Sequence, residues 1–215
     1  MRHFFKLFTF YFIGMAGAIG FLWTPFSWAQ ENTVLVMGDS LSAGYGMSLD
    51  QAWPTLLQEK LHESNPKAKW QVINASVSGE TTQGGVRRLP ALLDKFAPRW
   101  VLLELGANDG LRGYPIANIT ANLSAMIEQV QMTGANVAVL GIQLPPNYGA
   151  RYTDPFFAQY ATLAKKYDTA LVPFLLENVA GNRELMQADG LHPTLPAQSI
   201  IIANVWQHLD DFWLP

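Results

Sequence analysis

The strongest constraint on the fold is a regular alternation of short apolar, β-rich runs with segments of helical character. The five runs are Thr33–Gly38, Trp70–Ala75, Trp100–Gly106, Asn136–Ile142 and Thr169–Phe174. Most are nearly continuous in apolar residues, which is typical of parallel strands that are covered on both faces. Parallel strands need crossover connections, and these are right-handed. We therefore predict an α/β protein, a flavodoxin-like three-layer α/β/α sandwich around a five-stranded parallel sheet.

The segments between these runs carry apolar residues at helical spacing. In residues 50–64, Asp50 is the predicted N-cap of a helix. In residues 84–96, Pro90 is expected to bend or restart the helix. A third helix is expected to end at Gly134, and two more are predicted within residues 154–168 and 195–213. The predicted buried stripes are Trp53, Leu56, Leu57 and Leu61 in the first helix, and Ile116, Ile119, Leu123, Ile127 and Val130 in the third.

The first 29 residues have the features of a secretory signal peptide. Arg2 and Lys6 precede an apolar run from residue 7 to about residue 22, and Ser27 and Ala29 form a small-x-small site before Gln30. We expect cleavage after Ala29, a single domain over residues 30–215, and a periplasmic or secreted location with no stable membrane anchor. An uncleaved anchor is the alternative, because the apolar run is near the lower length limit of a membrane span.

Composition excludes several classes of function. The absence of cysteine removes disulfides, thiol catalysis and zinc–thiolate sites. A net charge of −3 gives no electrostatic reason to expect nucleic acid as a partner. We expect no metal or cofactor, and we expect a monomer with a core large enough to fold without disulfides.

Polar and small residues collect where the predicted strands end. The segments are "GDSLSAGYG" after the first run, "NASVSGETT" after the second, "GANDG" after the third, and "DGLHP" before the last helix. In parallel α/β sheets, sites form in the loops that leave the carboxyl ends of the strands. We therefore expect the functional site to lie in these four segments.

A serine nucleophile requires a base and a group that orients the base, and three residues meet this need. Ser40 follows the first strand, and His192 follows Asp189 by three residues in one short loop. The other histidines lie in the signal segment or near helix ends. The alternative is structural: Asp189 makes a turn with the glycine that follows it, His192 lies near the start of the last helix, and "GDS" consists of ordinary turn residues.

Taken together, the four segments resemble the four sequence blocks of the GDSL, or SGNH, hydrolase family, over nearly the whole mature chain. The longer strings "GDSLSAGYGMS" and "PRWVLLELGANDGLRG" strengthen the resemblance. It implies that Ser40 is the nucleophile and that Asp189 and His192 complete a catalytic triad. It also implies an oxyanion hole made by the backbone amides of Ser40 and Gly79 and the side-chain amide of Asn108.

The resemblance further implies a serine esterase for small-molecule acyl esters and thioesters, with acyl-CoA thioesterase, lysophospholipase and arylesterase activities. Two loops, Gly110–Pro115 and Leu144–Tyr152, are the expected walls of an acyl-chain pocket, although they could equally be surface turns. The chain departs from the pattern at Ala107, where a second glycine is common, and at Gln143, where a basic residue is expected. The expected pocket residues are Leu111, Tyr114, Leu144, Pro145, Asn147 and Tyr148.

Two other functions remain as alternatives. The first is a carbohydrate acetyl esterase with the same fold and the same serine chemistry. The second is a non-catalytic, flavodoxin-like module that binds an anion at Gly38–Gly46, where a glycine- and serine-rich loop precedes a helix. The absence of a Walker lysine and of a G-x-G-x-x-G motif argues against this second alternative.

Overall fold

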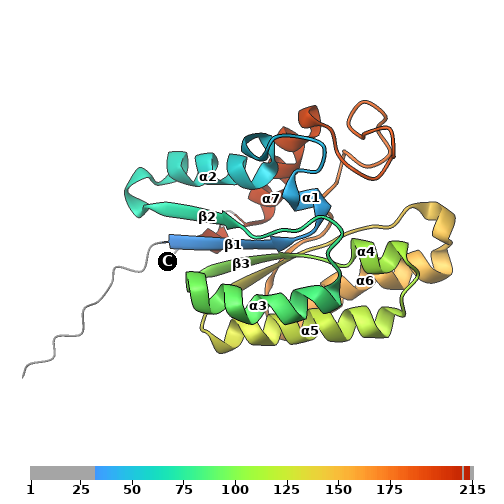
Figure 1. Ribbon diagram of the computed structural model, residues 1–215, viewed down its shortest axis with the longest axis horizontal. Helices are drawn as coiled ribbons and strands as arrows, with labels where there is room; N and C mark the ends of the chain where they lie inside the picture. The colour runs from blue at the N-terminus through green and yellow to red at the C-terminus, as the bar shows by residue number, and fades with distance from the viewer. Residues whose placement is uncertain (1–31, 210, 214–215) are drawn as a thin grey trace, which may run out of the picture.

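A computed structural model describes residues 32–209 and 211–213 of the chain, and these are built around one parallel sheet (Figure 1). The strand order is β2-β1-β3-β4-β5, and every neighbouring pair is parallel. The strands are β1 (Asn32–Gly38), β2 (Trp70–Asn74), β3 (Trp100–Glu104), β4 (Asn136–Leu140) and β5 (Ala170–Val172). The predicted five-stranded parallel sheet is confirmed. The predicted signal peptide and its cleavage site lie outside the described residues.

Helices cover both faces of this sheet. Figure 1 shows α2 and α7 on one face and α3, α5 and α6 on the other. Alternate residues of β1 point into two separate cores: Val34 and Val36 pack with α2 and α7, whereas Leu35 and Met37 pack with the opposite layer. The helices are α1 (Ser40–Ala43), α2 (Trp53–Ser64), α3 (Thr82–Phe96), α4 (Ala107–Leu111), α5 (Ile116–Met132), α6 (Ala150–Tyr167) and α7 (Gln198–Leu209). The predicted three-layer sandwich is confirmed, and within the described residues no helix could cross a membrane.

The start of α2 differs from the prediction. Asp50 is not its N-cap, because Asp50 lies in a separate 3₁₀ turn and the helix begins at Trp53, with Pro54 in its first turn. A proline fits there because its missing N–H would have no intrahelical acceptor. The Trp53 backbone N–H donates instead to Gln198 Oε1 of α7, at 2.9 Å. A contact between α2 and α7 therefore replaces the local N-cap that we predicted.

Pro90 does not interrupt α3, which runs without a break from Thr82 to Phe96. Leu89 and Leu93 are buried on its inner face, whereas Pro90 is exposed. A proline inside a helix leaves the carbonyl four residues earlier without its donor. The packing of the two leucines in the core holds the helix together despite this missing bond. The end of α5 agrees with the prediction, since Gly134 follows it with a φ of +80°.

Candidate active site

Ser40 is the first residue of α1, directly after β1, and its position depends on close packing at the end of that strand. Asp39 caps α1, because its Oδ1 accepts from the Leu41 backbone N–H at 3.0 Å. Gly38 pairs with Glu104 across the sheet, and a Cβ added to Gly38 would lie 2.6 Å from Glu104 Oε2. Glycine at this position therefore leaves room for the Glu104 carboxyl group and the Ser42 side chain next to the turn into Ser40.

The structure brings Ser40, His192 and Asp189 into one hydrogen-bonded chain. His192 Nε2 lies 2.9 Å from Ser40 Oγ, and His192 Nδ1 lies 2.6 Å from Asp189 Oδ2. The other oxygen, Asp189 Oδ1, accepts from the backbone N–H groups of Leu191 and His192, at 2.9 Å and 3.0 Å. Asp189 therefore orients the imidazole and also shapes the loop that carries it.

The hydrogen bond from His192, helped by the two backbone N–H groups, lowers the pKa of Asp189 to about 2. Asp189 is therefore ionised throughout the neutral range. An ionised carboxylate beside Nδ1 favours the tautomer that carries its proton on Nδ1, which leaves the lone pair of Nε2 directed at Ser40. This is the arrangement that a general base requires.

A further pair of residues, not identified from the sequence, holds the histidine loop against the loop after β1. Gln187 Nε2 donates to the carbonyls of Tyr45 and Pro193 at 2.9 Å and 3.0 Å, and the Gln187 backbone N–H donates to His192 O at 2.7 Å. The Tyr45 ring stacks on the His192 imidazole with 4.2 Å between ring centroids. Gln187 and Tyr45 are 142 residues apart, so no local signal pointed to this contact.

Asn108 and Gly79 reach the same end of the sheet from two other strands. Asn108 lies in α4, after β3, and its Nδ2 donates to Asp39 Oδ2 at 3.0 Å. Gly79 has a φ of +81°, a backbone conformation that favours glycine. The loop that carries Gly79 is fastened to β1, because Val77 donates its backbone N–H to Gly38 O at 3.1 Å. The end of β1, at Gly38 and Asp39, therefore contacts both Asn108 and the loop that carries Gly79.

Two buried carboxyl groups lie beneath the serine. Glu104 is fully buried, and its Oε2 accepts from Ser42 Oγ at 2.7 Å and from the Asp39 backbone N–H at 3.2 Å. Burial raises the pKa of Glu104 well above its usual range, and the nearby Asp39 carboxyl group raises it further. Burial also raises the pKa of Asp39 to about 6, against the hydrogen bonds from Leu41 and Asn108 that lower it. Above that pH, the Asp39 carboxylate orients the amide of Asn108.

Glu104 was not identified as a site residue from the sequence, although it is the lone carboxyl group within the apolar run of β3. Asp109 was not identified either; it is buried and holds α4 against the start of α3. Asp109 accepts from the backbone N–H and the hydroxyl of Thr82, at 2.9 Å and 2.7 Å. Because Asp109 follows Asn108 directly, these bonds limit where the Asn108 side chain can lie.

Ser40 opens into an apolar cavity of about 170 Å³. Of the expected acyl-pocket residues, Leu111, Leu144 and Pro145 line this cavity, and Tyr114, Asn147 and Tyr148 do not. Tyr148 instead braces the wall, because its hydroxyl donates to Leu111 O at 2.8 Å. In the described residues, no group of three or more histidine, aspartate or glutamate side chains is placed to hold a metal ion. The full lining is Ser40, Leu41, Ala107, Asn108, Leu111, Ile142, Gln143, Leu144, Pro145, Leu176, Leu191 and His192.

Comparison with known proteins shows which family this chain is similar to. The sequence profile of the GDSL-like lipase/acylhydrolase family matches residues 36–198, a span that contains all four polar segments. The chain belongs to the GDSL-like lipase/acylhydrolase family. The resemblance inferred from the sequence is therefore confirmed, as is the expected class of esterase.

Several characterised members of this family are similar to the chain over most of their length. The esterase TesA of Pseudomonas aeruginosa is 49% identical over 84% of this chain and 89% of that protein. The thioesterase 1/protease 1/lysophospholipase L1 of Escherichia coli is 47% identical over 80% of this chain and 81% of that protein. Among solved structures, the psychrotrophic esterase EstA of Pseudoalteromonas, inhibited by monoethylphosphonate, has a TM-score of 0.79 and 40% identity over 84% of this chain and 98% of that one.

Proposed function

We propose that this chain is a serine esterase that hydrolyses acyl esters and thioesters through an acyl intermediate on Ser40. One observation carries the proposal: the hydrogen-bonded chain from Asp189 through His192 to Ser40 ends at the mouth of an apolar cavity. This is the juxtaposition of nucleophile, base and orienting group that acyl transfer requires. The similarity to proteins named esterase and thioesterase supports the same function.

In the first half of the reaction, His192 Nε2 takes the proton of Ser40 as Oγ forms a bond to the acyl carbonyl carbon. The resulting imidazolium is stabilised by the Asp189 carboxylate. The carbonyl electron pair moves onto oxygen and then returns as the bond to the leaving oxygen or sulfur breaks, and His192 delivers its proton to that atom. In the second half, His192 takes a proton from water as the water oxygen bonds to the acyl carbon. The bond from that carbon to Ser40 Oγ then breaks, His192 returns the proton to Oγ, and the carboxylic acid leaves.

The developing oxyanion requires donors that are fixed before the reaction begins. We assign this role to the backbone N–H groups of Ser40 and Gly79 and to Nδ2 of Asn108. The Asn108 amide has two N–H bonds, and only one is used by Asp39, so the second is available to the substrate. Because Asp39 holds the first, the second does not have to be reoriented when the substrate arrives.

The lining of the cavity supports an acyl chain over a carbohydrate. The walls are formed mainly by Leu111, Ile142, Leu144, Leu176 and Leu191, and such a surface offers few hydrogen bonds to sugar hydroxyl groups. Acyl-CoA thioesters, lysophospholipids and aryl esters all present an apolar chain next to a good or moderate leaving group. Amide substrates should be the poorest, because an amine leaving group needs more help from a general acid.

Covalent labelling tests the proposal directly. A fluorophosphonate probe should label the folded protein with one adduct per chain, because the activated hydroxyl of Ser40 attacks phosphorus as it attacks a carbonyl. Mass spectrometry of a digest should place the adduct on Ser40. An adduct on another serine, or none on the folded protein, would contradict the serine esterase and favour the anion-binding module.

We also propose that the chain is exported and cleaved after Ala29. The basic residues, the apolar run and the small-x-small site support this. N-terminal sequencing of the protein recovered from its native host should start at Gln30, or at the pyroglutamate that forms from it. Recovery of the full-length chain in the membrane fraction would show an uncleaved anchor instead.

A further inference from the structure

The cavity beside Ser40 is the first in a series of three cavities with shared lining residues. A second cavity, of about 330 Å³, shares Gln143, Leu144, Pro145, Leu176 and Leu191 with the first. The second in turn shares Gly181, Met186 and Gly190 with a third, of about 410 Å³. The three cavities therefore adjoin one another, and we call the series that they form, from the nucleophile to the loops around residues 181–190, the groove. We call the third space the distal cavity; it is lined by Gly181, Asn182, Arg183, Met186, Gln187, Ala188 and Gly190.

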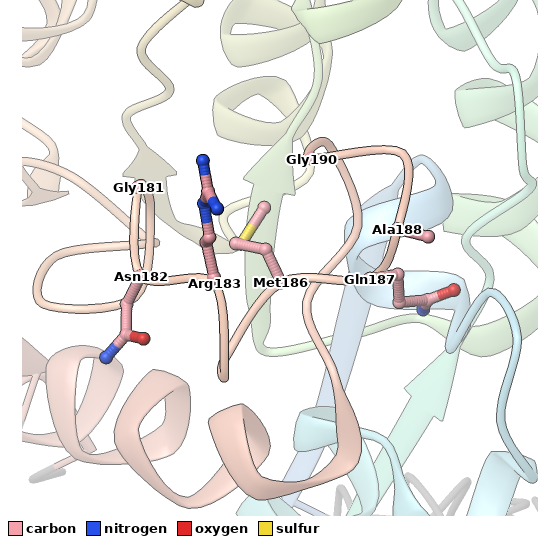
Figure 2. Close-up of a pocket in the computed structure, with 7 residues that line it drawn as sticks. All are labelled: Gly181, Asn182, Arg183, Met186, Gln187, Ala188 and Gly190. Carbon is pink, nitrogen blue, oxygen red and sulfur yellow. The ribbon is translucent and has the colours of Figure 1, made fainter.

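The character of the groove changes along its length. The walls near Ser40 are mainly aliphatic, and the second cavity adds Phe174, Ala180 and Met186. In the distal cavity, Met186 is joined by the guanidinium of Arg183. Figure 2 shows the side chains of Arg183 and Met186 projecting to the same side, into the space between Gly181 and Gly190, whereas Asn182 points away. The groove therefore ends with a cation next to an apolar wall.

Arg183 is exposed, and no carboxylate of the cavity lining faces its charge. No aspartate or glutamate lines any of the three cavities, and Arg183 is the one lining residue that carries a permanent charge. Within the described part of the chain, Arg183 takes part in no ion pair, and none of its N–H groups makes a hydrogen bond to the protein. Gln143, which lines the first two cavities, is neutral. A guanidinium presents five donors that match carboxylate and phosphate oxygens.

We propose that the distal cavity is a subsite for an anionic group, a carboxylate or a phosphate, that the substrate carries away from its scissile carbonyl. The proposal rests on the proposed esterase function, and it deepens that function by naming a class of preferred substrates. Two parts of a substrate could supply the anion. It is either a carboxylate at the far end of the acyl chain or a phosphate on the leaving group. When the anion is a carboxylate at the end of the acyl chain, the apolar part of the groove accommodates the methylene groups that lie between it and the ester.

Paired substrates test this subsite. One pair is p-nitrophenyl octanoate and the mono-p-nitrophenyl esters of dicarboxylic acids of increasing length. The other is a monoacylglycerol and the corresponding lysophosphatidic acid. For each pair the readout is the ratio of kcat/KM for the anionic ester to kcat/KM for the neutral one. Taking the ratio separates the subsite from the chemistry, because a failure of the esterase function would remove turnover of both members.

In at least one pair, Arg183→Gln should lower this ratio by about two- to fivefold, the size expected for a charged contact at an exposed side chain. Arg183→Lys should retain part of the ratio because it keeps the charge. Salt should lower the ratio of the wild type and leave that of Arg183→Gln unchanged, since screening acts on the charge. Arg87→Gln is the matched control, because Arg87 is an exposed arginine of α3, on the opposite face of the sheet.

A lower ratio for the dicarboxylic esters alone would place the anion at the end of the acyl chain, and a lower ratio for lysophosphatidic acid alone would place it on the leaving group. Either result supports the subsite. Unchanged ratios in both pairs, with neutral esters still hydrolysed, would overturn the subsite and leave the esterase function standing. An equal fall in the Arg87→Gln control would also overturn it, because the effect would then come from overall charge.

Discussion

Replacing His192 with alanine should reduce kcat for a short p-nitrophenyl ester by on the order of 10⁶-fold, as loss of the base does in the template serine hydrolases. His192 Nε2, at 2.9 Å from Ser40 Oγ, is the only base that the structure places on the hydroxyl. The fold should survive, because His192 lies in a loop at the sheet edge and contributes little to either core. Steady-state rates, with circular dichroism and thermal unfolding as the check on folding, measure both effects.

The two other histidines within the described residues are the controls for this experiment. His62 lies near the end of α2 and His208 near the end of α7, and both are exposed. His62→Ala and His208→Ala should therefore leave turnover unchanged. A large loss of activity in either variant, with its thermal stability intact, would mean that the base has been assigned to the wrong histidine.

Replacing Asp189 with asparagine should lower kcat by about 10⁴-fold, as the same change does in the template triad. An asparagine amide facing Nδ1 favours the imidazole tautomer that carries its proton on Nε2, which cannot accept the proton of Ser40. The loop itself should persist, because the asparagine carbonyl can still accept from the Leu191 and His192 backbone N–H groups that now bond Asp189 Oδ1. Rates and the retained thermal stability of Asp189→Asn test this separation of roles.

The order of the losses distinguishes the groups within the site. Asn108→Ala removes one of the proposed oxyanion donors, and the loss of such a donor costs about 10²- to 10³-fold in kcat. It should therefore be milder than Asp189→Asn, with the same substrate and at the same pH. Full turnover by a folded Asn108→Ala variant would rule out its role in the oxyanion hole and leave Asn108 as part of a structural turn.

Most of the architecture could be predicted from the sequence because it depends on local patterns of apolar residues. The run around Val34–Met37 is buried from end to end, as a central parallel strand must be. The predicted stripe of α5 is buried at Ile119, Leu123, Ile127 and Val130. A helix or strand shows its inner face through its own spacing, so these features need no knowledge of the partner element.

The two incorrect helix predictions arose where tertiary contacts outweighed a local sequence preference. Asp50 is a good N-cap residue by type, but α2 starts at Trp53, where Gln198 of α7 accepts the Trp53 N–H. Pro90 is a helix breaker by type, but buried leucines on either side of it hold α3 to the core. In both cases contacts between distant segments outweigh a local preference of about 1–3 kcal/mol.

For the candidate site, the sequence by itself determined which residues are available for chemistry: a serine after the first strand, a scarce histidine, and an aspartate close enough to orient it. Motifs carry such information because the residues within each motif are neighbours in the chain. Only the tertiary structure decided the contacts between motifs. It placed Gln187 on the Tyr45 loop, Glu104 beneath Asp39, and Arg183 at the end of a groove that begins at Ser40. Each of these contacts joins segments far apart in sequence, and such segments meet only when the strands and helices between them pack together.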